Sequence, residues 1–172
     1  AVSPDPRNTA LTELIVDFSE AVDGVDVSDL SLTRDGGPNL LSGSESFSTE
    51  DQIQWTLGDL SGLTGTEGSY AFTVAASGSG IADGAGNPLT QDASDAWVLD
   101  TTVPTADVID VTPDPRTTPV AQVEISFDEK VTGFDISDLS LTRNGGPNLL
   151  TGSETLSSPD GTRWTLEDIS GL

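Results

Sequence analysis

The chain has 172 residues, of which 34% are hydrophobic, and a formal net charge of −23 from 29 acidic and 6 basic residues. This length allows one complete small domain and most of a second, with enough apolar residues for small cores. The negative charge disfavours nucleic acid and anionic membranes as partners, and the absence of Cys and His excludes thiol catalysis, Cys/His zinc sites and imidazole acid–base chemistry.

Most of the chain has the alternating apolar pattern of β-strands, and no window shows a sustained helical period. Gly, Pro, Asn and Asp separate these segments at intervals typical of a β-sandwich. The expected strands are, in chain order, residues 14–18, 30–33, two strands on either side of a turn at Thr49–Asp51, 69–76, 96–100 and 105–113. The side chains expected to face inward are Leu14, Val16, Phe18, Leu30, Leu32, Ile53, Trp55, Leu57, Tyr70, Phe72 and Val74.

Two short features refine this pattern. In "DVSDL", Asp26 can cap a single helical turn, with Asp29 three residues further on in the arrangement of a capping box. Tyr70 lies at the start of a strand, two residues before the core position Phe72, where β-sandwiches place a tyrosine whose hydroxyl binds the backbone upstream. The alternative is that Tyr70 is an ordinary inward-facing aromatic residue.

A long repeat organises the chain. The stretch "DLSLTRDGGPNLLSGSE" at residues 29–45 returns as "DLSLTRNGGPNLLTGSE" at 138–154, a shift of 109 residues (138 − 29). About 36 of the 62 positions aligned by this shift are identical, without any gap. Because a catalytic motif repeats over a few residues only, we interpret this as the repeat of a whole domain, with a period close to the ~100 residues of an immunoglobulin-like sandwich.

The expected domains are residues 1–103 and 104–172, each built on a seven-strand plan. The segment between them, "DTTVPTADV" at 100–108, has no Gly, and Pro104 restricts both itself and Val103. We therefore expect a short, stiff connection. The second domain lacks counterparts of Tyr70, Phe72 and the last strand, so we expect an incomplete sandwich that is unstable in isolation unless other residues supply the missing strands.

Three separated motifs resemble those of bacterial Ig-like repeat domains. "FSEAVDGVDVSDLSLT" and "FDEKVTGFDISDLSLT" are similar to the opening strands of that family, "GIADGAGNPL" to a loop before its final strand, and "LDTTVPT" to its inter-domain junction. The resemblance implies tandem all-β sandwich modules of large extracellular or cell-surface proteins, often adhesins. It also implies that calcium can bind at domain junctions, as in several members of the family.

Calcium is the one cofactor we consider. Loops at facing ends of two successive sandwiches could bring several carboxylates to a junction, and Ca²⁺ accepts six to eight oxygen ligands in irregular geometry. Each candidate also has an ordinary structural interpretation, as a turn former, a helix cap or a loop hydrogen-bond acceptor. The candidate ligands are Asp100, Asp5, Glu129 and Asp135, with Asp83 and Asn87 facing a preceding domain in the same way.

The sequence favours a non-catalytic, structural spacer whose partners are neighbouring Ig-like repeats of the same chain or other copies in a fibre. No nucleophile elbow, P-loop or dinucleotide fingerprint is present, and no stretch approaches a transmembrane span. Two alternatives stay open: a fibre subunit completed by strand exchange between chains, and a module that binds a glycan or protein. The acidic surface could equally reflect calcium sites or a saline habitat.

Overall fold

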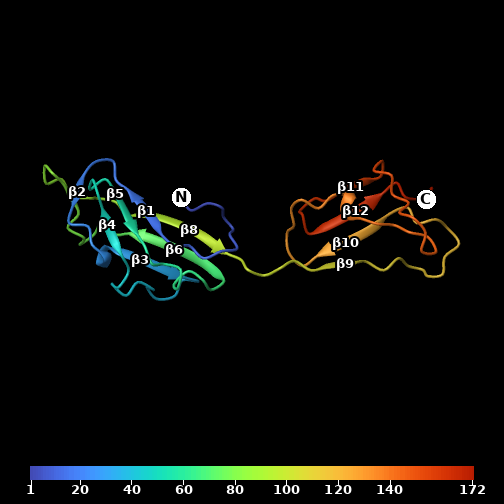
Figure 1. Ribbon diagram of the computed structural model, residues 1–172, viewed down its shortest axis with the longest axis horizontal. Coiled ribbons are helices and arrows are strands. Elements are labelled where there is room, and N and C mark those ends of the chain that lie inside the picture. Colours follow the sequence, from blue (N-terminus) through green and yellow to red (C-terminus); the bar gives the residue numbers. More distant parts are fainter. The chain divides into compact units, whose positions relative to one another are not determined.

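The computed structural model describes all residues from Ala1 to Leu172 and confirms that the chain is all-β (Figure 1). Its strands form several antiparallel sheets, and the only helical elements are two short 3-10 turns. No helix is long and apolar enough to cross a membrane. The chain divides into two compact units, Ala1–Thr101 and Thr102–Leu172, called unit 1 and unit 2 below.

Unit 1 is built mainly from two three-stranded antiparallel sheets, in the orders β1-β5-β4 and β3-β6-β8, while β2 and β7 form a small third sheet. The turn η1 leads directly into β3. The elements are β1 (Leu14–Asp17), β2 (Val22–Asp23), η1 (Val27–Asp29), β3 (Leu30–Arg34), β4 (Phe47–Thr49), β5 (Gln54–Leu57), β6 (Gly68–Val74), β7 (Ala82–Asp83) and β8 (Ala93–Leu99).

The two three-stranded sheets of unit 1 share one hydrophobic core. Leu57 comes from the first sheet and Leu32 from the second, and both are fully buried. The predicted inward positions of β1, β3 and β6 are confirmed, since period-2 alternation places them on the buried face. Trp97 of β8 stacks on Tyr70 of β6 with ring centroids 5.4 Å apart, which fills the middle of this core.

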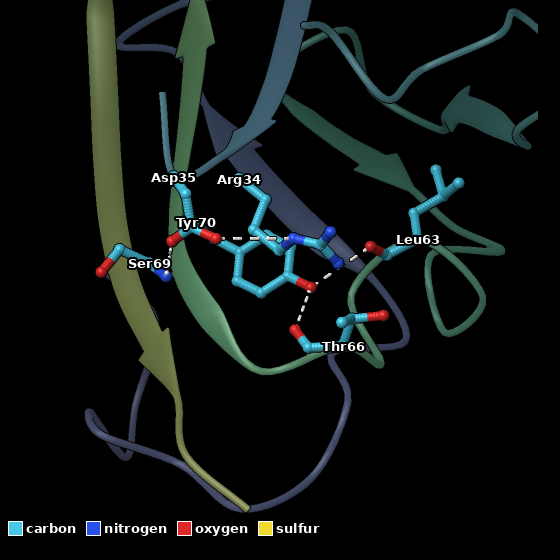
Figure 2. Close-up of polar contacts among 6 residues, drawn as sticks. All are labelled: Arg34, Asp35, Leu63, Thr66, Ser69 and Tyr70. Carbon is cyan, nitrogen blue, oxygen red and sulfur yellow. Dashed lines mark hydrogen bonds and ion pairs between the residues drawn. The ribbon is translucent and has the colours of Figure 1, made fainter. Parts of the chain in front are cut away.

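The hydroxyl of Tyr70 makes the upstream backbone contact that its position predicts (Figure 2). It donates to the carbonyl of Thr66 at 2.6 Å and lies 3.4 Å from the carbonyl of Leu63. The ring is buried, so the hydrogen bond also satisfies a polar group that would otherwise be costly to bury. Tyr70 therefore ties the start of β6 to the loop that precedes it.

The expectation that Ile53 faces the core is wrong. Ile53 is 39% exposed and lies in the bend before β5, which begins at Gln54. The carboxylate of Asp51 accepts hydrogen bonds from the backbone N–H groups of both Ile53 and Gln54, at 2.9 and 2.8 Å. This side-chain hydrogen bonding competes with strand pairing, so the turn extends two residues beyond Asp51 and breaks the alternation.

Unit 2 contains a single four-stranded antiparallel sheet in the order β11-β12-β10-β9. Its core is small, with Ile125, Leu166 and Ile169 as the buried residues. All three residues of β9 are exposed, although Val108 pairs with the buried Ile125. The elements are β9 (Ala106–Val108), β10 (Val123–Phe127), η2 (Ile136–Asp138), β11 (Thr155–Ser157) and β12 (Arg163–Glu167).

Unit 2 lacks the strand that the repeat predicts at Leu139–Thr142. The same letters, Leu-Ser-Leu-Thr, form β3 in unit 1, where Leu32 is fully buried and its neighbours pair with β6. In unit 2 no strand lies beside this segment. Its one β-type pairing is an isolated bridge from Thr142 to Asn148, and Leu141 is only half-buried. A strand needs a hydrogen-bonded neighbour, and the residues of unit 2 supply none here.

This difference predicts unequal effects of one substitution made at equivalent positions. Leu32→Ala should destabilise unit 1 by about 2 to 5 kcal/mol, because it leaves a cavity in a closed core. Leu141→Ala should cost unit 2 clearly less, since part of that side chain already contacts water. Urea unfolding followed by tryptophan fluorescence would measure both, and equal losses at the two positions would contradict the difference in burial.

Candidate functional site

Two of the predicted calcium ligands, Asp5 and Asp100, lie where the N-terminal segment runs beside β8. The backbone N–H of Arg7 donates to the Val98 carbonyl at 2.9 Å, and the N–H of Asp100 donates to the Arg7 carbonyl at 2.8 Å. The carboxylate of Asp5 accepts the N–H of Val98 at 2.9 Å. The structure thus places both residues where the N-terminal segment pairs with the end of β8. One oxygen of Asp5 already links these two segments through the Val98 N–H.

Asp83 and Asn87 contact each other directly across one loop. The two Asp83 oxygens accept three hydrogen bonds: from the Asn87 side-chain amide at 2.7 Å, from the Asn87 backbone at 2.8 Å and from the Ala85 backbone at 2.9 Å. The Asn87 amide, followed by its backbone N–H, lowers the pKa of Asp83. This is the loop-building role predicted as the alternative to metal binding, and Asn87 turns its NH₂ group toward the carboxylate.

Asp135 is the N-cap of η2. Its carboxylate accepts from the backbone N–H of Ser137 at 2.7 Å, and Asp138 reaches back to the Asp135 N–H at 2.9 Å. Asp26 makes the same capping box at η1, which confirms the turn predicted there. The Ser137 hydroxyl and backbone N–H lower the pKa of Asp135, so this residue stays ionised as a cap.

Glu129 is half-buried in the bend that follows β10. Its neighbour Asp128, which the sequence did not single out as a ligand, anchors the bend to the start of unit 2. The Asp128 carboxylate accepts the backbone N–H of Thr105 at 2.8 Å and the Thr105 hydroxyl at 2.7 Å. These donors, the backbone N–H first, lower the pKa of Asp128.

Two further carboxylate loops were missed at the sequence level. Glu45 accepts from the backbone N–H groups of Ser42 and Gly43, at 3.0 and 2.8 Å, and Glu154 closes the equivalent loop at residues 151–154. A signal was available, because a Ser/Thr-Gly-Ser-Glu sequence occurs in both copies. Periodicity does not identify this sequence as a loop closed by its own glutamate, because such a short loop has no hydrophobic period.

The turn before β12 contains a carboxylate with a large shift in pKa. The carboxylate of Asp160 accepts the backbone N–H groups of Thr162 and Arg163, at 2.9 and 3.1 Å. These donors lower the pKa of Asp160 from 3.8 to about 2, because they bind the ionised form. Asp51 makes the equivalent turn before β5, and hydrogen bonds from Gln54 and Ile53 lower its pKa.

Arg34 pairs with the carboxylate of its neighbour Asp35 (Figure 2). Its Nε lies 3.6 Å from an oxygen of Asp35, and the other Asp35 oxygen accepts the N–H of Ser69 at 2.9 Å. The pair is largely exposed, so it contributes little to stability. Arg143 has Asn144 in place of this aspartate and makes no equivalent ion pair.

The carboxylates in these loops act as acceptors for backbone N–H groups close by in sequence. No three Asp or Glu side chains gather into a group that could hold a metal ion. The six candidate ligands divide between the units, with Asp5, Asp83, Asn87 and Asp100 in unit 1 and Glu129 and Asp135 in unit 2. Chemically, the arrangement fixes loop backbones through ionised side chains.

In comparisons with known proteins, no family model matches this sequence, and no curated protein and no solved structure matches it.

The Asp160 turn predicts a pH dependence of stability. The pKa of Asp160 is lower in the folded chain than the ordinary 3.8. The turn therefore contributes stability above about pH 4 and loses it as the pH falls toward about 2. Asp160→Asn should reduce the fall in Tm of unit 2 across this window, because the amide has no charge to lose. A pH series of melting curves would measure it.

The matched control is Asp107→Asn, a change at an exposed residue of β9. This variant should keep the acid-dependent fall of the unchanged chain. An Asp160→Asn variant whose Tm falls as steeply between pH 4 and pH 2 as that of the unchanged chain would contradict the assignment.

Proposed function

We propose that the chain forms tandem Ig-like β-sandwich modules that act as a structural, non-catalytic spacer in an extracellular or cell-surface protein of the adhesin or fibre-forming type. The observation that carries this proposal is the repetition, 109 residues apart (138 − 29), of one sequence together with its local hydrogen bonds. A spacer needs the same module many times, whereas an active site or a binding tip is needed once.

The arrangement of unit 1 supports the Ig-like assignment. Its sheets β1-β5-β4 and β3-β6-β8 contain six of the strands expected in the two sheets of a seven-strand sandwich. The strand expected first in such a sandwich is represented by β9 in unit 2. Tyr70 supplies the tyrosine corner, and Phe72 stands where antibody domains carry a cysteine. The stacked Trp97 fills the core in place of a disulfide.

Equivalent hydrogen bonds in the two units support the tandem repeat. The side chain of Asn39 accepts the Leu32 N–H at 2.9 Å and donates to the Leu30 carbonyl at 3.2 Å. Asn148 does the same for Leu141 and Leu139, at 2.9 and 3.3 Å. The paired capping boxes and the paired glutamate loops repeat in the same way.

The placement of the aromatic residues favours a spacer over a glycan- or protein-binding module. Binding surfaces are enriched in exposed Trp and Tyr, which supply contact area. In this chain every Trp, Tyr and Phe side chain is buried or half-buried. Trp97 and Tyr70 are buried in the unit 1 core, and Trp55 and Trp164 pack against their own units.

The linker supplies a direct test of the spacer function. Val103 is 74% exposed, so we expect the restricted backbone before Pro104, and not packing of the Val103 side chain, to stiffen the linker. Because the chain has no Cys, spin labels can be attached to Glu13→Cys and Glu167→Cys, one exposed site in each unit. Double electron–electron resonance should give a narrow distance distribution that broadens with Pro104→Gly.

The control for that measurement is Val103→Ala, which shortens an exposed linker side chain without freeing the φ angle that proline fixes. An equally broad distribution in the unchanged chain and in the Pro104→Gly variant would show a flexible linker and would count against the spacer.

Calcium binding is the finer part of the proposal. Asp100 and Asp5 on unit 1, and Glu129 and Asp135 on unit 2, would supply oxygen ligands of the type that Ca²⁺ prefers. Bound Ca²⁺ would neutralise part of the −23 charge and limit bending of the linker.

We therefore expect millimolar Ca²⁺ to raise the Tm relative to EDTA at constant ionic strength. Free calcium tenfold above Kd adds ~1.4 kcal/mol of stability by mass action. The shift should be absent in an Asp5→Asn, Asp100→Asn double variant and present in Asp107→Asn, an exposed control. Equal, weak shifts with Ca²⁺ and Mg²⁺ would instead indicate a solvated acidic surface.

A further inference from the structure

An exposed turn at Asn144 and Gly145 lies in the loop that follows Leu141 in unit 2. We propose that this turn is a chemical modification site, at which Asn144 loses its side-chain amide through a cyclic imide and becomes aspartate or isoaspartate. The only co-reactant is water. The inference goes beyond the spacer function and does not depend on it.

The backbone of this turn is left-handed at both residues. The φ angle is 54° at Asn144 and 72° at Gly145. Two successive positive φ angles are typical of a type I′ turn, for which Asn followed by Gly is a preferred pair. A Cβ atom placed on Gly145 would meet no other atom within 4 Å, so neighbouring residues leave open space around its backbone nitrogen.

Both reacting groups of the turn are free of hydrogen bonds within the chain. The Asn144 side chain makes none, in contrast to that of Asn148, which bonds to Leu139, Leu141 and Leu150. The N–H that closes the turn is that of Gly146, which donates to the Arg143 carbonyl at 3.0 Å, while the Gly145 N–H has no acceptor. Because nucleophile and target carbon belong to adjacent residues, bond rotations within the turn suffice to bring them together.

The equivalent turn of unit 1 shows that this exposure belongs to the loop itself. Asp35 and Gly36 have φ angles of 53° and 69°, and both are exposed although β6 lies beside β3. The Gly36 N–H likewise has no acceptor, and Gly37 donates to the Arg34 carbonyl at 2.8 Å. The free backbone nitrogen therefore occurs in this loop both with and without a neighbouring β6.

The reaction begins when the backbone nitrogen of Gly145 attacks Cγ of Asn144. An N–Cγ bond forms, the proton of that nitrogen passes through solvent to the departing amide group, the Cγ–Nδ2 bond breaks and ammonia leaves. Water then opens the imide ring. Hydrolysis of the N–Cγ bond gives aspartate, whereas hydrolysis of the bond from the same nitrogen to the main-chain carbonyl carbon gives isoaspartate, whose backbone passes through Cβ and Cγ. No oxidant or reductant is consumed.

The other four asparagines lack this combination of a free side chain and a following glycine. Asn39 and Asn148 are held by hydrogen bonds in their own loops, and each is followed by a leucine, whose Cβ crowds the backbone nitrogen. Asn87 precedes a proline, which has no N–H to lose, and Asn8 precedes a β-branched threonine. Modification should therefore concentrate at Asn144.

Conversion to aspartate would give unit 2 the residue that unit 1 has at this place. There one carboxylate oxygen of Asp35 lies 3.6 Å from Nε of Arg34 (Figure 2). Aspartate at position 144 adds one negative charge beside Arg143, which makes no ion pair in the unmodified chain. Residues 138–148 would then match residues 29–39 at every position.

The test incubates the intact 172-residue chain at mildly alkaline pH, where the Gly145 nitrogen loses its proton more readily. Cleavage after glutamate then releases residues 130–154, a peptide that contains both Asn144 and Asn148. Mass spectrometry should show this peptide gaining about 1 Da as –NH₂ is replaced by –OH, with fragment ions that place the gain at position 144. Isoaspartate should appear as a second chromatographic peak of the same mass.

Variants of the two glycines test the mechanism. Gly145→Ala should slow the gain in mass at position 144 by at least about tenfold, because the added Cβ crowds the attacking nitrogen. Gly36→Ala is the matched control, since it makes the same change in the equivalent turn of unit 1 and should leave the rate at position 144 unchanged.

Asn144→Asp provides a measurement that does not depend on how the turn accepts alanine. This variant already carries the aspartate product, so its 130–154 peptide should gain no further mass under the same conditions.

Three results would overturn the proposal. The first is no gain in mass at position 144. The second is a gain at another asparagine that equals the gain at position 144. The third is a rate at position 144 that Gly145→Ala leaves unchanged. The spin-label measurement of the linker is independent of all three, so the spacer function and the modification site can fail separately.

Discussion

Pairing of β3 with β6 is the contact on which the order of a unit depends. With β6 in place, Leu30 and Leu32 are buried and the second sheet of unit 1 closes the core. Without an equivalent strand, the identical residues Leu139 and Leu141 leave the strand conformation and contact water. Sequence and local propensity are the same in both places, so the neighbouring strand decides the conformation, as expected for β-structure.

The acidic composition has a structural use that is separate from metal binding or solubility. Carboxylates of Asp51, Asp83, Asp135, Glu154 and Asp160 each accept backbone N–H groups within a few residues of themselves. Such hydrogen bonds stabilise the ionised form and fix turns that Gly-rich loops would leave free. A chain with few aromatic residues and no disulfide thus obtains ordered loops from its charged residues.

The alternating apolar pattern was sufficient to predict the all-β class and the inward faces of β1, β3 and β6, because burial on one face follows directly from period-2 alternation. It failed at Ile53, where hydrogen bonds to Asp51 extend the turn, and at Leu139–Thr142, where no strand of unit 2 takes the place that β6 holds beside β3 in unit 1. For the candidate ligands, the residue types indicated side chains with oxygen acceptors. The sequence could not show which hydrogen bonds these oxygens accept, because most of the donors are backbone N–H groups, which nearly all residues carry.

The side-chain contacts of Asn39 and Asn148 have a consequence for how such a chain folds during synthesis. In unit 2, Asn148 makes the same contacts as Asn39 although the strand it would support has not formed. The loop geometry is therefore set by residues within ten positions of one another, whereas sheet closure waits for β6 and β8. Low-contact-order structure forms early and long-range pairing late. A module emerging from the ribosome can hold its loops in register before its final strands exist, which shortens the search that remains when those strands arrive.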